Sequence, residues 1–269
     1  MRNITKRVAQ ALIGIVFCIP FYLLFTLASK KPDDVSSMWK PALYWNINNF
    51  LSAWDKAHIG RALVNTTLIT TCTVILIVLV GSLAAYPLAR RPHRLNRFVS
   101  MILISCLVVP PLTVLVPLYT FIVDLGGLNT RWAMVLILVT FQLPLSIFLF
   151  TNFIKTLPTE LDEAATIEGC SSLKVFFLIL FPLLKPVTSA IVILCGIQVW
   201  NDYQFSLFFL QRSPMHTIAV ALSQFVSQYQ NDIGLVAAGC LVGILPMTVI
   251  YLFLQKYFVR GLSEGAMKG

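Results

Sequence analysis

The stretch Leu157–Pro186 reads LPTELDEAATIEGCSSLKVFFLILFPLLKP and separates two long apolar runs. The whole chain is 58% hydrophobic and only 12% charged, so a compact charged stretch stands out. We call it the acidic segment, because it holds four of the chain's eleven acidic residues: Glu160, Asp162, Glu163 and Glu168.

Local signals in the acidic segment predict two short helices that lie outside the lipid. Pro158 disfavours continuation of the helix before it, and Thr159 is placed to cap the next one with its side-chain oxygen. The acidic residues at 160, 162 and 163 then fall in a first turn, where the helix dipole favours negative charge. From this local physics alone, an ordinary polar loop between membrane helices stays an open alternative.

The later residues of the acidic segment predict a docking surface and a bend. Ala164 and Ala165 have almost no side chain, so another surface can approach this helix closely. Gly169 can adopt the left-handed conformation that ends a helix. Ser171 or Ser172 can then cap the second helix.

The composition of the chain places most of it in a bilayer. Its mean hydropathy is +0.82, whereas a soluble domain is less apolar and about one quarter charged. The net charge of +9 comes from 20 basic residues that form no stripe, so we expect anchoring at helix ends and no nucleic-acid partner. We therefore predict an all-α membrane protein.

Hydropathy and length predict six spans. The expected spans are Val8–Ala28, Leu63–Leu88, Phe98–Val123, Trp132–Phe153, a fifth that begins between Phe177 and Val187 and ends near Val199, and Val236–Tyr257. The first run also has the basic start and apolar core of a signal peptide, but its length of about 20 residues favours a span. The polar stretch before Gly60 is expected outside, with short helices at the membrane surface.

The distribution of basic residues predicts which side of the membrane each end faces. With six spans, thirteen of the 20 Lys and Arg residues fall in inner segments and seven in outer ones. Because cytoplasmic segments carry the excess of positive charge, we expect both termini and the acidic segment to be cytoplasmic.

The acidic segment also resembles a known signature. Glu163-Ala164-Ala165, then Gly169, then Ile179-Leu180-Phe181-Pro182 match the spacing EAA-x3-G-x9-I-x-L-P of binding-protein-dependent ABC importer permeases, with Phe181 as the one departure. The run Ala84–Arg90 and the pair Trp200-Asn201 are similar to further patterns of these permeases. The final residues 261–269 resemble the ending of the second permease subunit in maltose-type carbohydrate importers.

This resemblance implies a fold and a domain organisation. The fold is the type I ABC importer transmembrane domain, with six transmembrane helices and cytoplasmic coupling helices. Residues 1–60 form an N-terminal helix and external segment, 61–257 the permease core, and 258–269 a cytoplasmic tail. The implied localisation is the cell membrane of a bacterium or archaeon.

The resemblance also implies partners and site residues. The partners are a second permease subunit in a heterodimer, two cytoplasmic ATPase subunits that bind ATP and Mg, an external sugar-binding protein, and membrane lipid. The implied site residues are Glu163, Ala164, Ala165, Gly169 and Pro182 for coupling to the ATPase, Gly261, Gly265 and Lys268 for an ATPase-facing tail, and Pro110, Pro111, Trp200 and Asn201 for the translocation path or the binding-protein side. For the prolines of the third span, a purely structural kink stays an equal alternative.

The chain has none of the residue patterns that would give it chemistry of its own. It contains no Gly-x-x-x-x-Gly-Lys-[Ser/Thr] phosphate loop, and its three histidines are dispersed. We therefore expect no catalytic residue, no metal and no cofactor bound by this chain. A secondary ion-coupled transporter and a membrane-embedded enzyme are the alternatives, but the spans lack a central carboxylate pair and a nucleophile with a base. No residue reveals which sugar would be transported.

Overall fold

The computed structural model describes residues 2–34, 36–42, 44–91 and 93–266, with side chains over 6–253 of these. Every regular element in the described residues is helical. The elements are α1 (Arg2–Ala28), α2 (Ile47–Lys56), α3 (Ile59–Arg90), α4 (Arg94–Cys106), η1 (Pro111–Val114), α5 (Leu115–Asp124), α6 (Arg131–Thr156), α7 (Glu160–Ile167), α8 (Ser172–Val175), η2 (Phe176–Leu180), α9 (Phe181–Leu183), α10 (Lys185–Trp200), α11 (Gln204–Phe209), η3 (Ser213–Met215), α12 (Ile218–Gln228) and α13 (Ile233–Ala266).

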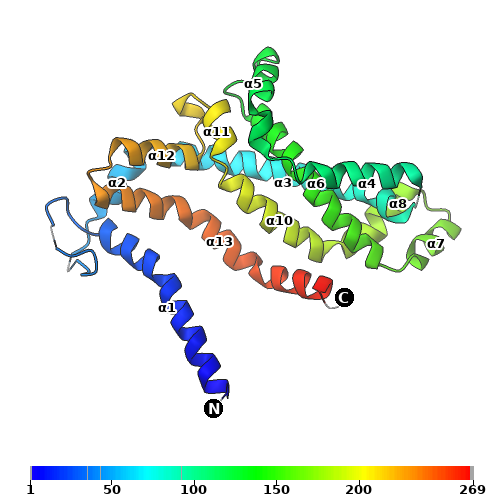
Figure 1. Cartoon of the computed structure of the whole chain (residues 1–269), viewed down its shortest axis with the longest axis horizontal. Coiled ribbons are helices and arrows are strands. Elements are labelled where there is room, and N and C mark those ends of the chain that lie inside the picture. Colours follow the sequence, from blue (N-terminus) through cyan, green and yellow to red (C-terminus); the bar gives the residue numbers. More distant parts are fainter. Residues whose placement is uncertain (1, 35, 43, 92, 267–269) are drawn as a thin grey trace. The chain divides into compact units, whose positions relative to one another are not determined.

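Four of these helices, α1, α3, α6 and α13, are long and apolar enough to cross a membrane (Figure 1). Two further candidates are helix pairs with a sharp bend, Arg94–Cys106 with Pro111–Asp124 and Ser172–Leu183 with Lys185–Trp200. The described chain thus has up to six spans when each bent pair counts as one. This agrees with the predicted fold class, although two of the predicted spans are not simple helices.

Pro110 and Pro111 interrupt the third span as the sequence predicts, but the interruption is a break in the helix and not a kink. The helix axes of α4 and the η1–α5 pair differ by 95°, and the chain between them leaves the helical conformation. Pro110 has ψ 126°, an extended value, and it precedes Pro111. A residue before a proline is disfavoured in a helix, and the proline itself removes a backbone donor, so two consecutive prolines break the helix and do not merely bend it.

The fifth span is also broken, at Leu184. The run α8–η2–α9 and the helix α10 meet there at 75°, and α10 begins at Lys185, within the predicted range. The η2 turn is π-helical, a local widening that often accompanies a change of direction. Leu184 itself is fully buried, whereas Lys185 is exposed at the start of α10.

The chain divides into two compact units, which we describe separately. Unit 1 holds the residues up to Val64 and His216–Pro246, and unit 2 holds Asn65–Met215 and the residues from Met247 onward. The long helices α3 and α13 each contribute to both units.

In unit 1, side-chain amides anchor the end of α1. The Asn49 amide of α2 donates to the carbonyl oxygens of Ala28, at 3.0 Å, and Lys30, at 2.7 Å. α13 approaches the same place through Gly234, where a Cβ atom would lie 2.9 Å from the Asn49 amide nitrogen. Beyond α1, hydrogen bonds from Ser36 and Tyr44 lower the pKa of the Asp34 carboxyl to about 2.

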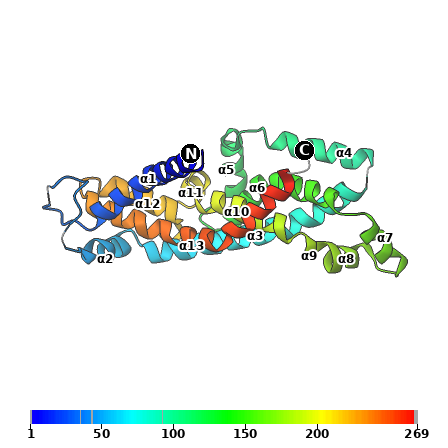
Figure 2. The ribbon, with the colours of Figure 1, turned by 90° about the horizontal axis from the view of Figure 1, so that it is seen from below.

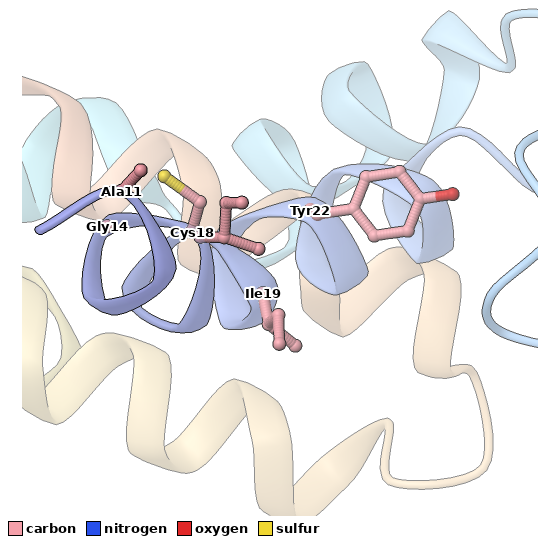
Figure 3. Close-up of a pocket in the computed structure, with 6 residues that line it drawn as sticks. Ala11, Gly14, Cys18, Ile19 and Tyr22 are labelled. Atoms are coloured by element: carbon pink, nitrogen blue, oxygen red, sulfur yellow. The ribbon is translucent and has the colours of Figure 1, made fainter. Parts of the chain in front are cut away.

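The rest of α1 has few partners in the described chain. Of the apolar stretch that makes α1 a candidate span, only 11% is buried in the described chain, compared with 44% for the corresponding stretch of α6. One face has a shallow apolar depression at Gly14, bordered by Ala11, Cys18 and Tyr22 (Figure 3). This exposure means that lipid or another chain must cover α1.

In unit 2, α3 and α6 pack closely at Gly81 and Ser146. A Cβ atom at Gly81 would overlap the hydroxyl of Ser146, which is fully buried and donates to the Ile77 carbonyl oxygen at 3.1 Å. Phe150 and Ile191 belong to the hydrophobic cluster around this contact, so α10 joins the same core. Small residues are the usual means of close helix approach in membranes.

This close contact generates a first prediction. Gly81→Ala should lower the free energy of unfolding by about 1–3 kcal/mol, because the added methyl group forces α3 and α6 apart. Thermal unfolding of the purified protein in detergent measures the effect. Gly14→Ala is the matched control, since no atom lies within 4 Å of the added group. An unchanged unfolding temperature for Gly81→Ala would contradict the packing at Ser146.

Candidate functional site

The acidic segment folds into the two short helices that the sequence predicts, α7 and α8. Glu160, Asp162 and Glu163 occupy the first turn of α7. Thr159 is at the N-cap position, but its side chain makes no cap hydrogen bond, and only its carbonyl oxygen accepts from the Asp162 and Glu163 amides. The prediction of a side-chain cap is therefore wrong, because Thr159 has helical dihedral angles and not the extended ones that a capping residue adopts.

The bend after α7 is the one predicted at Gly169. Gly169 has φ +84°, a left-handed value that disfavours residues with a Cβ atom. Its amide donates to the Thr166 carbonyl oxygen at 3.0 Å, and the Cys170 amide donates to the Ala165 carbonyl oxygen at 3.0 Å. This pair of bonds is the Schellman motif, which gives partners to the last carbonyls of the helix and reverses the chain.

The two alanines of α7 have different environments. Ala165 is only 5% exposed and packs inside the chain, whereas Ala164 and Glu163 are exposed. Of the two alanines, only Ala164 therefore belongs to the predicted close-approach surface. The side chain of Ile167, which is 87% exposed at the end of the same helix, adds an apolar group to this surface.

An ion pair that the sequence analysis missed attaches α7 to α3. The Arg90 guanidinium lies 2.9 Å from the Asp162 carboxylate, and both side chains are largely buried. Arg90 also donates to the carbonyl oxygens of Leu157, at 3.0 Å, and Pro158, at 3.2 Å. The Tyr86 hydroxyl donates to the other Asp162 carboxylate oxygen at 2.9 Å. We call these contacts the Arg90 clamp.

The Arg90 clamp explains two features of the sequence. Tyr86 and Arg90 are one turn apart, so the end of α3 presents both toward α7. The Tyr86 ring also lies 5.7 Å from that of Phe176, centre to centre, in the π-helical turn after α8. The end of α3 therefore contacts both parts of the acidic segment, which lies at the opposite end of unit 2 from α11 (Figure 2).

The other predicted site residues lie in different elements. Pro182 is exposed in α9, within the helical run that leads from α8 to α10. Pro110 and Pro111 are exposed at the break between α4 and α5. In the described residues, no group of three or more His, Cys, Asp or Glu is arranged to hold a metal ion.

The pair Trp200-Asn201 divides between the core and the surface. Trp200 is the last residue of α10 and only 4% exposed, so its indole does not line an open path. Asn201 is exposed, and its amide donates back to the Ile197 carbonyl oxygen at 2.9 Å. Of the two residues, only Asn201 is placed to meet a solute.

The predicted tail is helical as far as it is described. α13 continues to Ala266, well beyond the predicted end of the sixth span at Tyr257, so Gly261 and Gly265 lie on helical backbone. Lys268 lies outside the described residues.

Comparison with known proteins identifies the family. Residues 77–264 match the family described as binding-protein-dependent transport system inner membrane component. The chain is 46% identical to the melibiose/raffinose/stachyose import permease protein MelC of Bacillus subtilis, over 100% of this chain and 99% of that protein. It is 31% identical to the multiple sugar-binding transport system permease protein MsmG of Streptococcus mutans, over 98% and 96% of the two chains.

A solved structure shows the same fold. The match is to a chain of a bacterial ABC transporter involved in the import of the acidic polysaccharide alginate, with a TM-score of 0.79. It covers 95% of this chain and 97% of that chain at 20% identity, so it is evidence for the fold alone.

The chain therefore belongs to the inner membrane components of binding-protein-dependent transport systems, the permeases of ABC importers. It is a multi-pass membrane subunit with the type I importer fold, and it is a transport component rather than an enzyme. The family predicted from the acidic segment is confirmed, and none of these comparisons favours the alternative, a secondary ion-coupled transporter.

The Arg90 clamp generates a second prediction. Arg90→Ala should speed amide hydrogen exchange in residues 160–167 about tenfold, because α7 loses its ion pair with α3 and the chain just before α7 loses two hydrogen bonds to the same side chain. Exchange followed by mass spectrometry on the purified protein measures it. Arg91→Ala, the exposed neighbour, is the matched control. Equal exchange in the two variants would show that the clamp does not hold α7.

Proposed function

We propose that this chain is one of two permease subunits of an ABC importer that takes up an oligosaccharide delivered by an external sugar-binding protein. The observation that carries the proposal is the 46% identity with MelC along the whole chain. MelC is named for melibiose, raffinose and stachyose, and MsmG for multiple sugars. Small galactose-containing oligosaccharides are therefore the first substrates to test.

The complex that this function requires has further subunits. A second permease would complete the membrane domain, and two cytoplasmic subunits would bind ATP and Mg and hydrolyse the ATP. The lack of a phosphate loop in this chain supports the assignment of ATP binding and hydrolysis to other subunits. The match to a binding-protein-dependent family supports an external binding protein as the source of the sugar.

We further propose that α7 and the bend at Gly169 couple the permease to an ATPase subunit. α7 presents acidic side chains beside the exposed Ile167, a surface suited neither to lipid nor to water alone. Glu163, Ala164 and Gly169 would contact the partner, with Ala165 and Pro182 supporting them from inside the chain and from α9. The residues Gly261, Gly265 and Lys268 would face the ATPase pair from the tail.

The experiment for the transport function uses the complete complex, purified through a tag on this chain and placed in lipid vesicles with its binding protein. Radiolabelled melibiose, raffinose, stachyose, maltose and alginate oligosaccharides are offered outside, with ATP inside. We expect ATP-dependent accumulation of at least one of the neutral sugars, and hydrolysis that rises when binding protein and sugar are present. No accumulation of any sugar would refute the carbohydrate proposal.

The same vesicles test the role of α7. Gly169→Val should lower sugar-stimulated hydrolysis and uptake, because a β-branched residue resists the left-handed conformation. Gly126, which also has positive φ and no atom within 4 Å of an added Cβ, gives the matched control Gly126→Val. Equal coupling in the two variants would refute the assignment of the bend.

We propose that both termini and the acidic segment face the cytoplasm of the cell, as the charge asymmetry indicates. In a chain without its native cysteines, an impermeant maleimide added outside should label Ser37→Cys and Ser213→Cys. It should not label Asn96→Cys or Ser263→Cys until the membrane is permeabilised. Labelling of the last two from outside would reverse the topology.

A further inference from the structure

Helix α10 ends beside the middle of α6, and not at its end. The Gln142 amide of α6 donates to the Gln198 side-chain oxygen of α10 at 2.6 Å. Gln142 follows the start of α6 by eleven residues, a rise of about 16 Å, and the hydrocarbon core is about 30 Å thick. Because Gln198 is only two residues before the end of α10, this helix terminates near the centre of the bilayer.

The chain beyond α10 stays close to α6 as it runs back toward the start of α6. The Phe205 ring of α11 stacks on that of Phe141, with 4.8 Å between ring centres. The Asn129 amide, just before α6, donates to the Phe209 carbonyl oxygen at 2.8 Å. The non-helical residues 201–203 therefore lie at mid-depth, next to Gln198.

Non-helical backbone at this depth must be buried in protein or line a water-filled cavity. Here the inward side chains are buried: Val199, Trp200 and Phe205 are at most 5% exposed. The outward side chains Gln198, Asn201 and Gln204 are exposed and polar. An exposed row of amides is unsuited to lipid, because each unpaired amide costs free energy in hydrocarbon.

The amide pair keeps hydrogen-bonding capacity. A Gln side chain has two N–H donors on nitrogen and an accepting oxygen. In the described part of the chain, the side chains of Gln142 and Gln198 make one hydrogen bond, and this bond joins them to each other. The Gln142 oxygen and the Gln198 nitrogen thus offer one acceptor and one donor group side by side, with the Asn201 amide one turn further. Two neighbouring hydroxyls of a pyranose, each both donor and acceptor, match this arrangement.

We propose that Gln142, Gln198 and Asn201 form a contact site for the transported sugar within the membrane, at the broken end of α10. The proposal rests on the carbohydrate function proposed above and names the residues that would meet the sugar's hydroxyl groups. Gln142 and Gln198 come from different spans, so the site depends on the packing of α6 against α10. The competing explanation is that the amide pair only holds these two helices together.

The two explanations differ in what single and double variants do. Uptake of labelled raffinose is measured in the reconstituted complex for Gln142→Leu, Gln198→Leu and the double variant, with Asn152→Leu as the control. Asn152 is an exposed amide on the same helix, further toward its other end. For a sugar contact, each single variant should lower the maximal uptake rate about five- to tenfold. The concentration for half-maximal uptake, which the binding protein governs, should stay unchanged.

The double variant and the choice of sugar decide between the explanations. A sugar contact predicts that the double variant is no better than the worse single one, and that melibiose, raffinose and stachyose are affected unequally. A purely structural pair predicts that the double variant recovers, because no orphan amide remains, and that all sugars are affected equally. The structural outcome would overturn the proposal, as would full activity of the single variants.

A labelling measurement covers the case in which the leucine variants fail to assemble. Gln198→Cys in a cysteine-free complex should react with a small soluble maleimide, and saturating raffinose should slow the reaction at least threefold. A rate that raffinose leaves unchanged, in a complex that transports raffinose, would overturn the site alone. If the wild-type complex transports no sugar, the carbohydrate function fails, and the sugar site fails with it.

Discussion

The constraint on which this structure depends is that backbone N–H and C=O groups inside a bilayer need partners within the protein. Helices meet it without help, and the described chain consists of helices and their connections. Each departure from a simple span therefore has a local reason. Pro110 and Pro111 break the third span, and a buried residue, Leu184, joins the two parts of the fifth. The short non-helical stretch 201–203 after α10 carries polar side chains.

Hydropathy predicts the long helices well because burial in lipid needs only length and apolar composition. Gly169 was also predictable, since few residues tolerate the backbone conformation that ends α7. The breaks were less predictable: a proline in a membrane helix can bend it or end it, and the result depends on which neighbours accept the freed carbonyls. The end of α10 beside the middle of α6 follows from packing, which hydropathy does not describe.

The side-chain contacts of the candidate site were not readable from the chain order. Arg90 and Asp162 are 72 positions apart in sequence, and each alone looks like an ordinary charge at a helix end. Ala165 was expected at a docking surface because its side chain is small, and Trp200 was expected along the translocation path because of a family pattern, yet both side chains are buried. A motif identifies the positions that matter, but the fold decides which of them face a partner and which support the neighbours that do.

The single residue between α9 and α10 has a mechanical consequence. Leu184 is fully buried, its amide donates to the carbonyl oxygens of Leu180 and Phe181, and its own carbonyl oxygen accepts from the Thr188 amide of α10 at 2.9 Å. The joint is therefore hydrogen-bonded to the helical turns on both sides. α10 extends about 24 Å from it as a straight rod. A rotation of about 5° at the joint would displace the far end of the rod by about 2 Å. Any change of the bend angle at Leu184 would therefore displace Gln198, near the far end of α10, more than it displaces the residues next to the joint.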